Sequence, residues 1–367
     1  MAGNPIKRLF DLYTSELSFE EMERMIKKES AAVYDFYKTE IPKPIPHQNK
    51  LNRSIVFIRS LFNAFLLKLS PVRRVFYLSA LLIFIVGIAS NNTAYQIFSF
   101  LILNILIAFE LADKLIVKDD IVLAKKIQKS LMPDGPFSND HFEISAHSEA
   151  AHEVGGDYFD IIKSSKSDKT FVVIGDISGK GMPAALYMVR VQAILQFLIE
   201  TFSDTKKITI ELKKYFAQKL KRDYFLTMSL ASIDKNGTVR FVRAGHLPTI
   251  HFKSNTKAFI ELNPNGIGIG FNDKGLFEKT LSEKTIKCEP NDILCFYTDG
   301  VTEAMNIRKI QFGTERLEKI IAENSEKSVA EIKEKILETI NRFRGNAEIN
   351  DDLSIVLLKA KQQTLTT

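Results

Sequence analysis

The stretch FVVIGDISGKGMPAALYM, Phe171–Met188, joins a short apolar strand to the start of a helix. The apolar run ends at Asp176, and glycines follow on either side of Lys180 before a helical pattern begins at Pro183. A strand-end aspartate followed by glycine is usually a turn or helix-cap residue. By itself the stretch therefore predicts a strand, a tight turn and a helix, with one carboxylate held at the turn.

Other segments repeat this design, with aspartate beside an apolar strand. They are VGGDYFD with Asp157, ILCFYTDGVTEAMN with Asp299, and EINDDLSIVLLK with Asp351 and Asp352. If these strands are neighbours, the carboxylates converge on one spot, where mutual repulsion raises their pKa values. Divalent cations remove that repulsion, and oxygen ligands without histidine or cysteine favour Mg²⁺ or Mn²⁺. The sequence therefore predicts a metal site built by aspartates from distant segments.

From Phe142 onward, short β-rich runs alternate with turns and with helical patterns. The runs are FEISAHSE, YFDIIKS, TFVVIGD, FLTMSLASID, VRFVRAGH, DILCFYTDG and DLSIVLLKA. Helical spacing recurs over 183–202, 208–220 and 329–344, and the Asn-Gly pair in SIDKNGTVRFV predicts a hairpin. Hairpin-like strands with interspersed helices predict antiparallel sheets covered by helices, rather than a doubly wound parallel sheet.

A series of motifs follows one order along the chain: EVGGDYFDI, GDISGKGMPAAL, AGHLP, YTDGVTEAMN, FGTERL and DDLSIVLL. In that order they resemble metal-dependent PPM-type serine/threonine protein phosphatases, and most closely the bacterial SpoIIE/RsbU-like branch. The resemblance covers residues 124–359. It implies an α+β fold, an α-β-β-α sandwich of two antiparallel sheets flanked by helices, with two Mn²⁺ or Mg²⁺ ions at one edge.

The resemblance also implies roles for individual residues. The metal ligands are expected to be Asp157, Asp176, Asp299, Asp351 and the backbone carbonyl of Ile177. Asp176, which is expected to bridge both ions, and Asp299 are expected to hold the nucleophilic water. Supporting roles are expected for Asp160, Gly300 and Asp352.

The implied reaction is hydrolysis of phosphoserine or phosphothreonine by a water that the two metals activate. The implied substrate is a phosphorylated signalling protein, a STAS-type anti-sigma-factor antagonist in a partner-switching pathway, and no substrate-binding residue can be named. A second reading is a membrane-anchored signalling scaffold with a catalytically weak, phosphatase-like binding domain.

The chain departs from the branch at two places. Arg243 stands where asparagine is common before AGH, and GIGIGF is looser than the usual loop. Neither is a proposed ligand, so a difference is expected in substrate preference rather than in activity. Lys180 is expected to be a solvated loop residue, with contact to the phosphate as the alternative, and His246 is expected to shape a loop.

Spacing and composition disfavour other cofactors and partners. GDISGKG has one residue too few for a Walker loop, and GIGIGF lacks the third glycine of a dinucleotide turn. The net charge of +6 includes no basic block, so no nucleic-acid partner is expected. Cys288 and Cys295 have no CxxC spacing and indicate neither a disulfide framework nor a zinc site.

The N-terminal third contains the most apolar segments. Residues 72–89 and 94–112 carry little charge and approach the roughly 20 apolar residues that a membrane-spanning helix needs. Basic residues flank the pair while the connecting turn is uncharged, so both ends are predicted to face the cytoplasm. We therefore expect a protein of the cytoplasmic membrane with its catalytic domain in the cytoplasm. A soluble hairpin in a cytoplasmic protein is the alternative, because Gln96 and Asn104 are polar.

These patterns divide the chain into predicted regions. They are an N-terminal helical region (1–70), a transmembrane helical hairpin (71–112), a linker or switch helix (113–132), the phosphatase domain (133–362) and a tail (363–367). In the first region, Ser18 and Glu21 form a capping box for a helix that runs to Lys38. The linker has apolar spacing typical of a coiled-coil seam over barely two heptads. It is therefore expected either to form a homodimer or to pack on its own domain.

Overall fold

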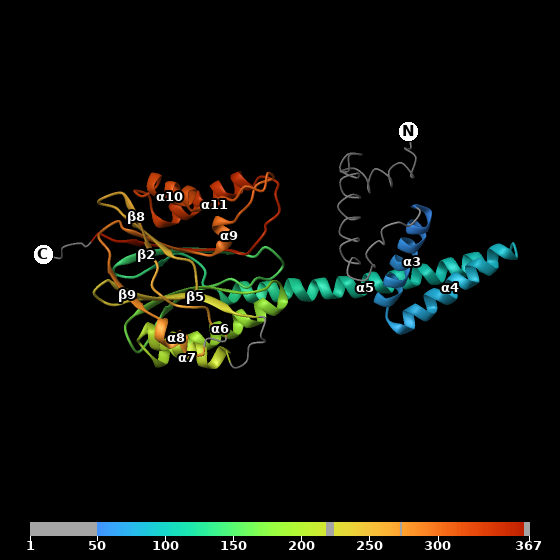
Figure 1. The fold of residues 1–367 in the computed structure, drawn as a ribbon, viewed down its shortest axis with the longest axis horizontal. Coiled ribbons are helices and arrows are strands. Elements are labelled where there is room, and N and C mark those ends of the chain that lie inside the picture. The colour runs from blue at the N-terminus through green and yellow to red at the C-terminus, as the bar shows by residue number, and fades with distance from the viewer. Residues whose placement is uncertain (1–49, 218–223, 272–273, 363–367) are drawn as a thin grey trace, which may run out of the picture. The chain divides into compact units, whose positions relative to one another are not determined.

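The computed structural model describes residues 50–217, 224–271 and 274–362. The predicted helix 18–38 and the tail 363–367 lie outside the described residues. The chain divides into two compact units, residues 1–116 and 117–367, which are coloured along the chain in Figure 1. Each unit is described by itself.

The described part of the first unit is helical. Its helices are α3 (Lys50–Lys68), α4 (Pro71–Ala89) and the beginning of α5 (Thr93–Leu131). The turn between α4 and α5 is tight, because Asn91 adopts a φ of 52° and the side chain of Asn92 accepts a hydrogen bond from Ala94 N at 3.0 Å. The predicted second hairpin segment and the predicted linker belong to one continuous helix, α5.

Polar contacts hold α4 and α5 side by side. Ser99 Oγ donates to the carbonyl of Ala80 at 2.6 Å, and Ser99 is fully buried. Arg73 forms ion pairs with Glu110 at 2.9 Å and with Asp113 at 2.7 Å. These bonds leave the apolar side chains of the pair facing outward, and most of the large ones are exposed.

Two described helices are long and apolar enough to cross a membrane, α4 and α6 (Met182–Thr201). Only 11% of the 18-residue apolar stretch of α4 is buried. In α6 the buried share is 44%, and that helix belongs to a folded core. The second predicted span, 94–112, lies within α5 and is not one of these two. Its large apolar side chains are nonetheless mostly exposed, for example Phe100 at 64% and Ile107 at 65%.

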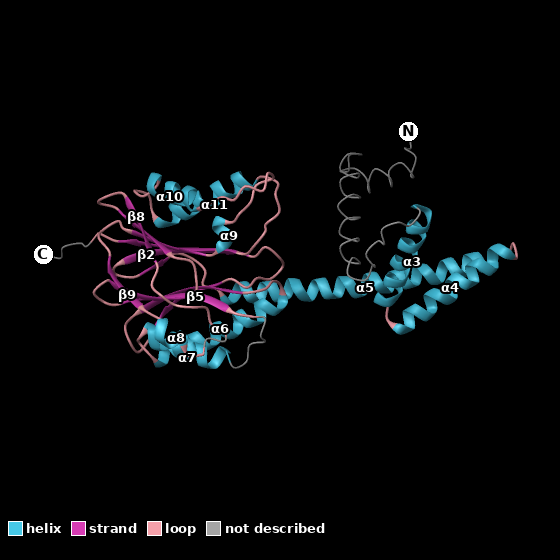
Figure 2. Cartoon of the chain, in the orientation of Figure 1, coloured by secondary structure: helices cyan, strands magenta, loops and turns pink. Residues whose placement is uncertain are grey.

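The second unit contains two antiparallel sheets, which Figure 2 shows as magenta layers between helices. The first sheet has the order β1-β2-β11-β10-β7-β8 and the second β3-β4-β5-β6-β9. The strands of the first are β1 (Phe137–Ser138), β2 (Phe142–Glu149), β7 (Thr249–Lys253), β8 (Ala258–Leu262), β10 (Ile293–Tyr297) and β11 (Leu353–Ala360). Those of the second are β3 (Tyr158–Lys163), β4 (Thr170–Ile177), β5 (Leu226–Ile233), β6 (Thr238–Ala244) and β9 (Glu283–Lys287).

Helices cover the outer face of each sheet (Figure 1). The second sheet packs against α6 and α7 (Thr205–Ala217), with α8 (Leu276–Thr280) beside them. The first sheet packs against α10 (Thr314–Glu323) and α11 (Val329–Arg344), and the short α9 (Asp299–Thr302) follows β10. The predicted helical patterns correspond to α6, α7 and α11, whereas α10 was not predicted.

Each central strand is apolar on both faces because both faces are covered. In β4, Phe171 and Val173 pack toward α6, while Val172 and Ile174 pack between the sheets. This follows from the period of two along a strand. The prediction of antiparallel sheets covered by helices is confirmed, and the α-β-β-α order follows from the three buried clusters.

The predicted hairpin is also confirmed. β5 and β6 pair in antiparallel register, and Gly237 at the tip has a φ of 75°. Asp234 Oδ1 accepts hydrogen bonds from Asn236 N and Thr238 N at 2.9 and 3.0 Å. The turn residues therefore set the register between β5 and β6, two interior strands of the second sheet.

Candidate active site

The predicted carboxylates lie at adjoining strand ends of the two sheets. In the second sheet, Asp157 directly precedes β3 and Asp176 lies near the end of β4, and the register pairs Tyr158 with Gly175. In the first sheet, β10 leads into Asp299, while Asp351 and Asp352 directly precede β11, and Tyr297 pairs with Ile355. Because both strand pairs are antiparallel, the carboxylates within each pair lie at one end of the sheet.

Hydrogen bonds join these ends across the two sheets. Thr298 Oγ1 donates to Asp157 Oδ2 at 2.7 Å, although the two residues are 141 positions apart in the chain. Gly156 N donates to Asp352 Oδ2 at 2.6 Å, and Ala151 N donates to Asp352 Oδ1 at 2.8 Å. Asp352 therefore ties the loop before β3 to the start of β11, a supporting position rather than one open to solvent.

Glycines allow this close approach. A Cβ at Gly155 would lie 2.4 Å from Asp352 Oδ2, and one at Gly300 would lie 2.0 Å from the carbonyl oxygen of Asp352. A Cβ at Gly156 would lie 2.6 Å from the carbonyl oxygen of Ile177. The predicted carbonyl ligand thus lies directly beside the loop that carries Asp157, and any larger residue there would displace it.

The carboxylates perturb one another strongly. Burial, followed by repulsion from Asp299 and Asp351, raises the pKa of Asp176 to about 7. Burial and then the charge of Asp176 raise the pKa of Asp157 well above its ordinary value. Burial and then Asp351 raise the pKa of Asp299. The carboxylates therefore act as one cluster, and metal-free burial of their charges is unfavourable.

Lys180 supplies the cation that lies nearest to this cluster among the described contacts. Its Nζ lies 3.0 Å from Asp351 Oδ2 and donates to the carbonyl of Asn350 at 2.6 Å. The lysine side chain is 47% exposed. Lys180 is therefore solvated, as expected, and it also forms an ion pair with Asp351, which was not expected.

Two other predicted residues have mainly structural contacts. Asp160 accepts hydrogen bonds from Tyr158 Oη at 2.8 Å and Gln196 Nε2 at 3.2 Å, so its carboxylate faces α6. His246 is buried between Thr227 and the carbonyl of Tyr297, and burial lowers its pKa to about 4. A neutral histidine with hydrogen bonds at both ring nitrogens agrees with the expectation that His246 shapes a loop.

Two residues in contact with the site were not predicted. Thr298 is fully buried, donates to Asp157 and accepts from Ser354 N at 2.9 Å. Gln128 of α5 donates to the carbonyl of Gly155 at 2.7 Å and accepts from its N–H at 3.2 Å. The position of Thr298 directly before Asp299 was a signal. No signal marked Gln128 except its place in the predicted coiled-coil seam. Its contact with Gly155 shows that this face of α5 packs on the phosphatase domain.

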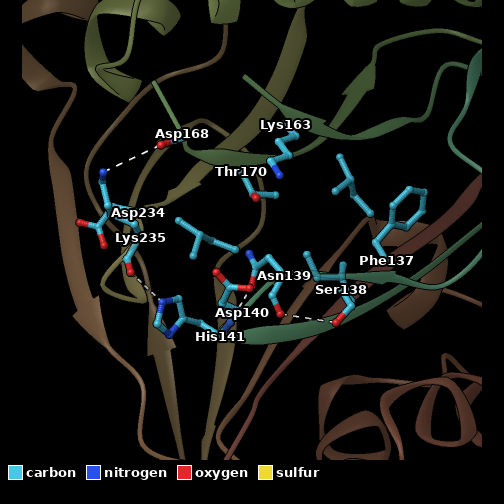
Figure 3. Close-up of a pocket in the computed structure, with 13 residues that line it drawn as sticks. Phe137, Ser138, Asn139, Asp140, His141, Lys163, Asp168, Thr170, Asp234 and Lys235 are labelled. Atoms are coloured by element: carbon cyan, nitrogen blue, oxygen red, sulfur yellow. Dashed lines mark hydrogen bonds and ion pairs between the residues drawn. The ribbon is translucent and has the colours of Figure 1, made fainter. Parts of the chain in front are cut away.

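A cavity in the second unit lies away from the carboxylates. It measures about 450 Å³ and is lined by residues such as His141, Lys163, Asp168, Thr170 and Lys235, shown in Figure 3. Lys163 ends β3 and Thr170 begins β4, so the cavity lies at the strand ends opposite the carboxylate cluster. None of the predicted site residues lines it. The chemistry is better located by the clustered charges, since a site for a protein-borne phosphate can be shallow.

A second grouping has ligand-like composition. Among the described residues, the ligand atoms of His251, Cys288 and Asp292 all lie within 4.8 Å of one another, whereas the aspartates form no group as compact as this. Asp292 instead accepts hydrogen bonds from His251 at 2.9 Å, Ser254 N at 2.9 Å and Glu289 N at 3.1 Å, which gives it a structural role.

Comparison with known proteins agrees with this fold and site. The SpoIIE family, described as Stage II sporulation protein E, matches residues 166–361, more than half of the chain. The chain is 27% identical over 252 residues to phosphoserine phosphatase RsbU of Bacillus subtilis, a match that covers 67% of this chain and 71% of RsbU.

Solved structures show the same fold. The SiaA-PP2C domain of Pseudomonas aeruginosa has a TM-score of 0.58 at 19% identity and covers 68% of this chain and 98% of that domain. The RsbU and RsbW domains of Rv1364c from Mycobacterium tuberculosis have a TM-score of 0.52 at 22% identity and cover 61% of each chain. The prediction of a PPM-type phosphatase domain is confirmed, and the chain belongs to the SpoIIE family.

Proposed function

We propose that this protein is a metal-dependent phosphatase that hydrolyses phosphoserine or phosphothreonine on a signalling protein. The observation that carries the proposal is the convergence of aspartates from four strand ends on one cluster, in which burial and neighbouring carboxylates raise the pKa values of Asp157, Asp176 and Asp299. The RsbU relative, which is named a phosphoserine phosphatase, supports the reaction class.

The donor set suits hard divalent cations. The proposed ligands are Asp157, Asp176, Asp299, Asp351 and the carbonyl of Ile177, which are all oxygen donors and match the preference of Mn²⁺ and Mg²⁺. When bound, two such ions would activate a water and neutralise charge on the phosphoryl oxygens. Ionising these buried, mutually repelling carboxylates is unfavourable, which is why their pKa values are raised. Bound cations would remove that repulsion.

The chain's own residues hold and orient the donors. Thr298 donates to one oxygen of Asp157 and so fixes the position of that carboxylate, and Asp176 is carried by the buried end of β4. Asp352 fixes the Gly155–Gly156 loop through two backbone N–H groups. Such preorganised donors lower the reorganisation needed in the transition state.

The test is phosphate release from p-nitrophenyl phosphate and from a phosphoserine peptide with Mn²⁺ and Mg²⁺. Asp299→Asn is expected to lower kcat by at least about a hundredfold, an effect typical of losing a group that positions the nucleophile. Asp168→Asn, which changes an exposed aspartate at the opposite strand ends, is the matched control. Wild-type protein that binds Mn²⁺ calorimetrically but never releases phosphate would favour the scaffold function instead.

The partner, the location and the assembly belong to the same proposal. The relative RsbU, and the RsbU and RsbW domains joined in the M. tuberculosis chain, support a partner-switching context with a phosphorylated STAS-type antagonist as substrate. The exposed apolar surface of α4 and early α5 supports a membrane hairpin that leaves the phosphatase domain in the cytoplasm. Exposed apolar residues on the later part of α5, Leu123 and Ile127, leave a face for a homodimer.

A further inference from the structure

Residues 305–311, MNIRKIQ, form a hydrogen-bonded turn that is separated from the end of α9 by two residues. Met305 and Gln311 form an isolated antiparallel β-bridge, and Asn306 N donates to the carbonyl of Ile310 at 3.1 Å. The side-chain oxygen of Asn306 accepts from Arg308 N at 2.9 Å and from Ile310 N at 3.1 Å. The segment, called the 305–311 turn below, is therefore held by its own hydrogen bonds.

The 305–311 turn displays apolar and basic side chains to solvent. Ile307 is 76% exposed, the highest value among the large apolar side chains that the structure describes, and Ile310 is 48% exposed. Arg308 and Lys309 are also exposed, and neither makes an ion pair with a described residue. Two exposed isoleucines and two exposed cations are thus present within four successive residues, 307–310, called the tip below, a combination typical of interaction surfaces.

Backbone hydrogen bonds connect the turn to the segment that begins with Asp299. Phe312 N donates to the carbonyl of Ala304 at 2.9 Å, and Gly313 N donates to that of Thr302 at 2.8 Å, which ties the turn to the helix that begins with Asp299. Phe312 is fully buried and anchors the base. Met305 lines a small hollow together with Gly300 and Asp351. The turn therefore begins at a hollow that one of the predicted metal ligands, Asp351, also lines.

We propose that the 305–311 turn is the docking site for the phosphoprotein substrate, a folded serine-phosphorylated protein with an acidic and apolar surface beside its phosphoserine. The inference rests on the proposed phosphatase function. The carboxylate cluster repels an acidic partner until cations neutralise it, and Arg308 and Lys309 place positive charge on the adjoining turn. A partner that covers Ile307 and Ile310 removes their apolar area from water, which stabilises the complex.

Docking of this kind predicts that protein and small-molecule substrates respond differently. The probes are a serine-phosphorylated STAS-domain protein from the same genome and p-nitrophenyl phosphate, assayed with Mn²⁺ and the full-length protein. Ile307→Ser and the double change Arg308→Glu with Lys309→Glu are each expected to lower kcat/KM for the phosphoprotein by about tenfold, mainly through KM. Hydrolysis of p-nitrophenyl phosphate is expected to stay within about twofold, because that substrate is too small to contact the tip.

Matched controls change equivalent residues away from the site. Ile260→Ser alters an exposed isoleucine on the edge strand β8, and Lys284→Glu with Lys287→Glu reverses two exposed lysines on β9. Neither is expected to affect either substrate.

Several outcomes would overturn the docking site. Unchanged hydrolysis of the phosphoprotein by both tip variants would do so, as would an equal loss on both substrates. A wild-type kcat/KM for the phosphoprotein no higher than for a short phosphoserine peptide would also overturn it, since no surface outside the cluster would then contribute. If the wild type releases phosphate from no substrate, the proposed function itself fails, which is a separate result.

Discussion

Asp176→Asn is expected to stabilise the metal-free protein while it abolishes stabilisation by metal. In the metal-free fold the pKa of Asp176 is raised from 3.8 to about 7, because the carboxylate is buried and lies near Asp299 and Asp351. A shift of about 3 units corresponds to about 4 kcal/mol of unfavourable free energy for the ionised form at high pH. Because the neighbouring carboxylates share this repulsion, about 2–4 kcal/mol is expected to be recovered by the neutral amide.

The sign of the pH dependence follows from linkage. The folded-state pKa is higher than the unfolded one, so the folded state binds more protons between the two values, and stability falls as pH rises from about 4 to 7. Above the folded pKa the loss is complete. The wild type in EDTA is therefore expected to lose stability over this window, and Asp176→Asn is expected to show a flatter curve.

The assay is thermal or urea unfolding of the full-length protein, followed by circular dichroism in EDTA and in Mn²⁺ at pH 5 and 7.5. At pH 7.5 in EDTA the variant is expected to be the more stable protein, and Mn²⁺ is expected to raise the stability of the wild type only. Asp168→Asn serves as the control, since its carboxylate is exposed at the opposite strand ends. A variant that is no more stable than the wild type in EDTA at pH 7.5, with the same pH slope, would refute the electrostatic reasoning.

Three other predictions follow from particular contacts. Thr298→Val removes the donor to Asp157 and is expected to weaken the apparent Mn²⁺ affinity and lower kcat by about ten- to a hundredfold, whereas Thr298→Ser retains both in a Mn²⁺ titration of activity. Gly300→Ala places a Cβ 2.0 Å from the carbonyl oxygen of Asp352 and is expected to destabilise the fold by about 3 kcal/mol or more; an unchanged urea midpoint would contradict the close approach. Full-length protein is expected to stay in the membrane fraction after a carbonate wash, whereas Leu82→Glu with Ile85→Glu, which charges exposed positions of α4, is expected to release it. Wild-type protein in the soluble fraction would contradict the membrane hairpin.

The sequence predicted those features that depend on neighbouring residues. The apolar runs of β4 and β11, the Asn-Gly hairpin between β5 and β6 and the helical spacing of α6 and α11 are all short-range patterns, and the structure has each of them. The glycine-flanked aspartates were visible for the same reason. Their role as metal ligands stays a prediction, although the structure brings them to adjoining strand ends.

The remaining features depend on which strands and helices become neighbours. The hydrogen bond from Thr298 to Asp157 spans 141 positions, and the one from Gly156 to Asp352 spans 196, so no local pattern could indicate them. The same holds for Gln128, whose partner Gly155 lies in another element. Asp160 shows the converse, since its place in a shared motif did not reveal that its carboxylate faces α6.

By itself, then, the sequence determined seven of the strands, the helices α6, α7 and α11, the antiparallel character of the sheets and the candidate carboxylates, whereas β1, β7, β8, β9 and α10 were not predicted. Only the tertiary structure decided which strand ends meet, which donors orient the carboxylates and which face of α5 packs on the domain. The physical reason is that propensity and periodicity act over a few residues, whereas the site is assembled by the order of strands in two sheets.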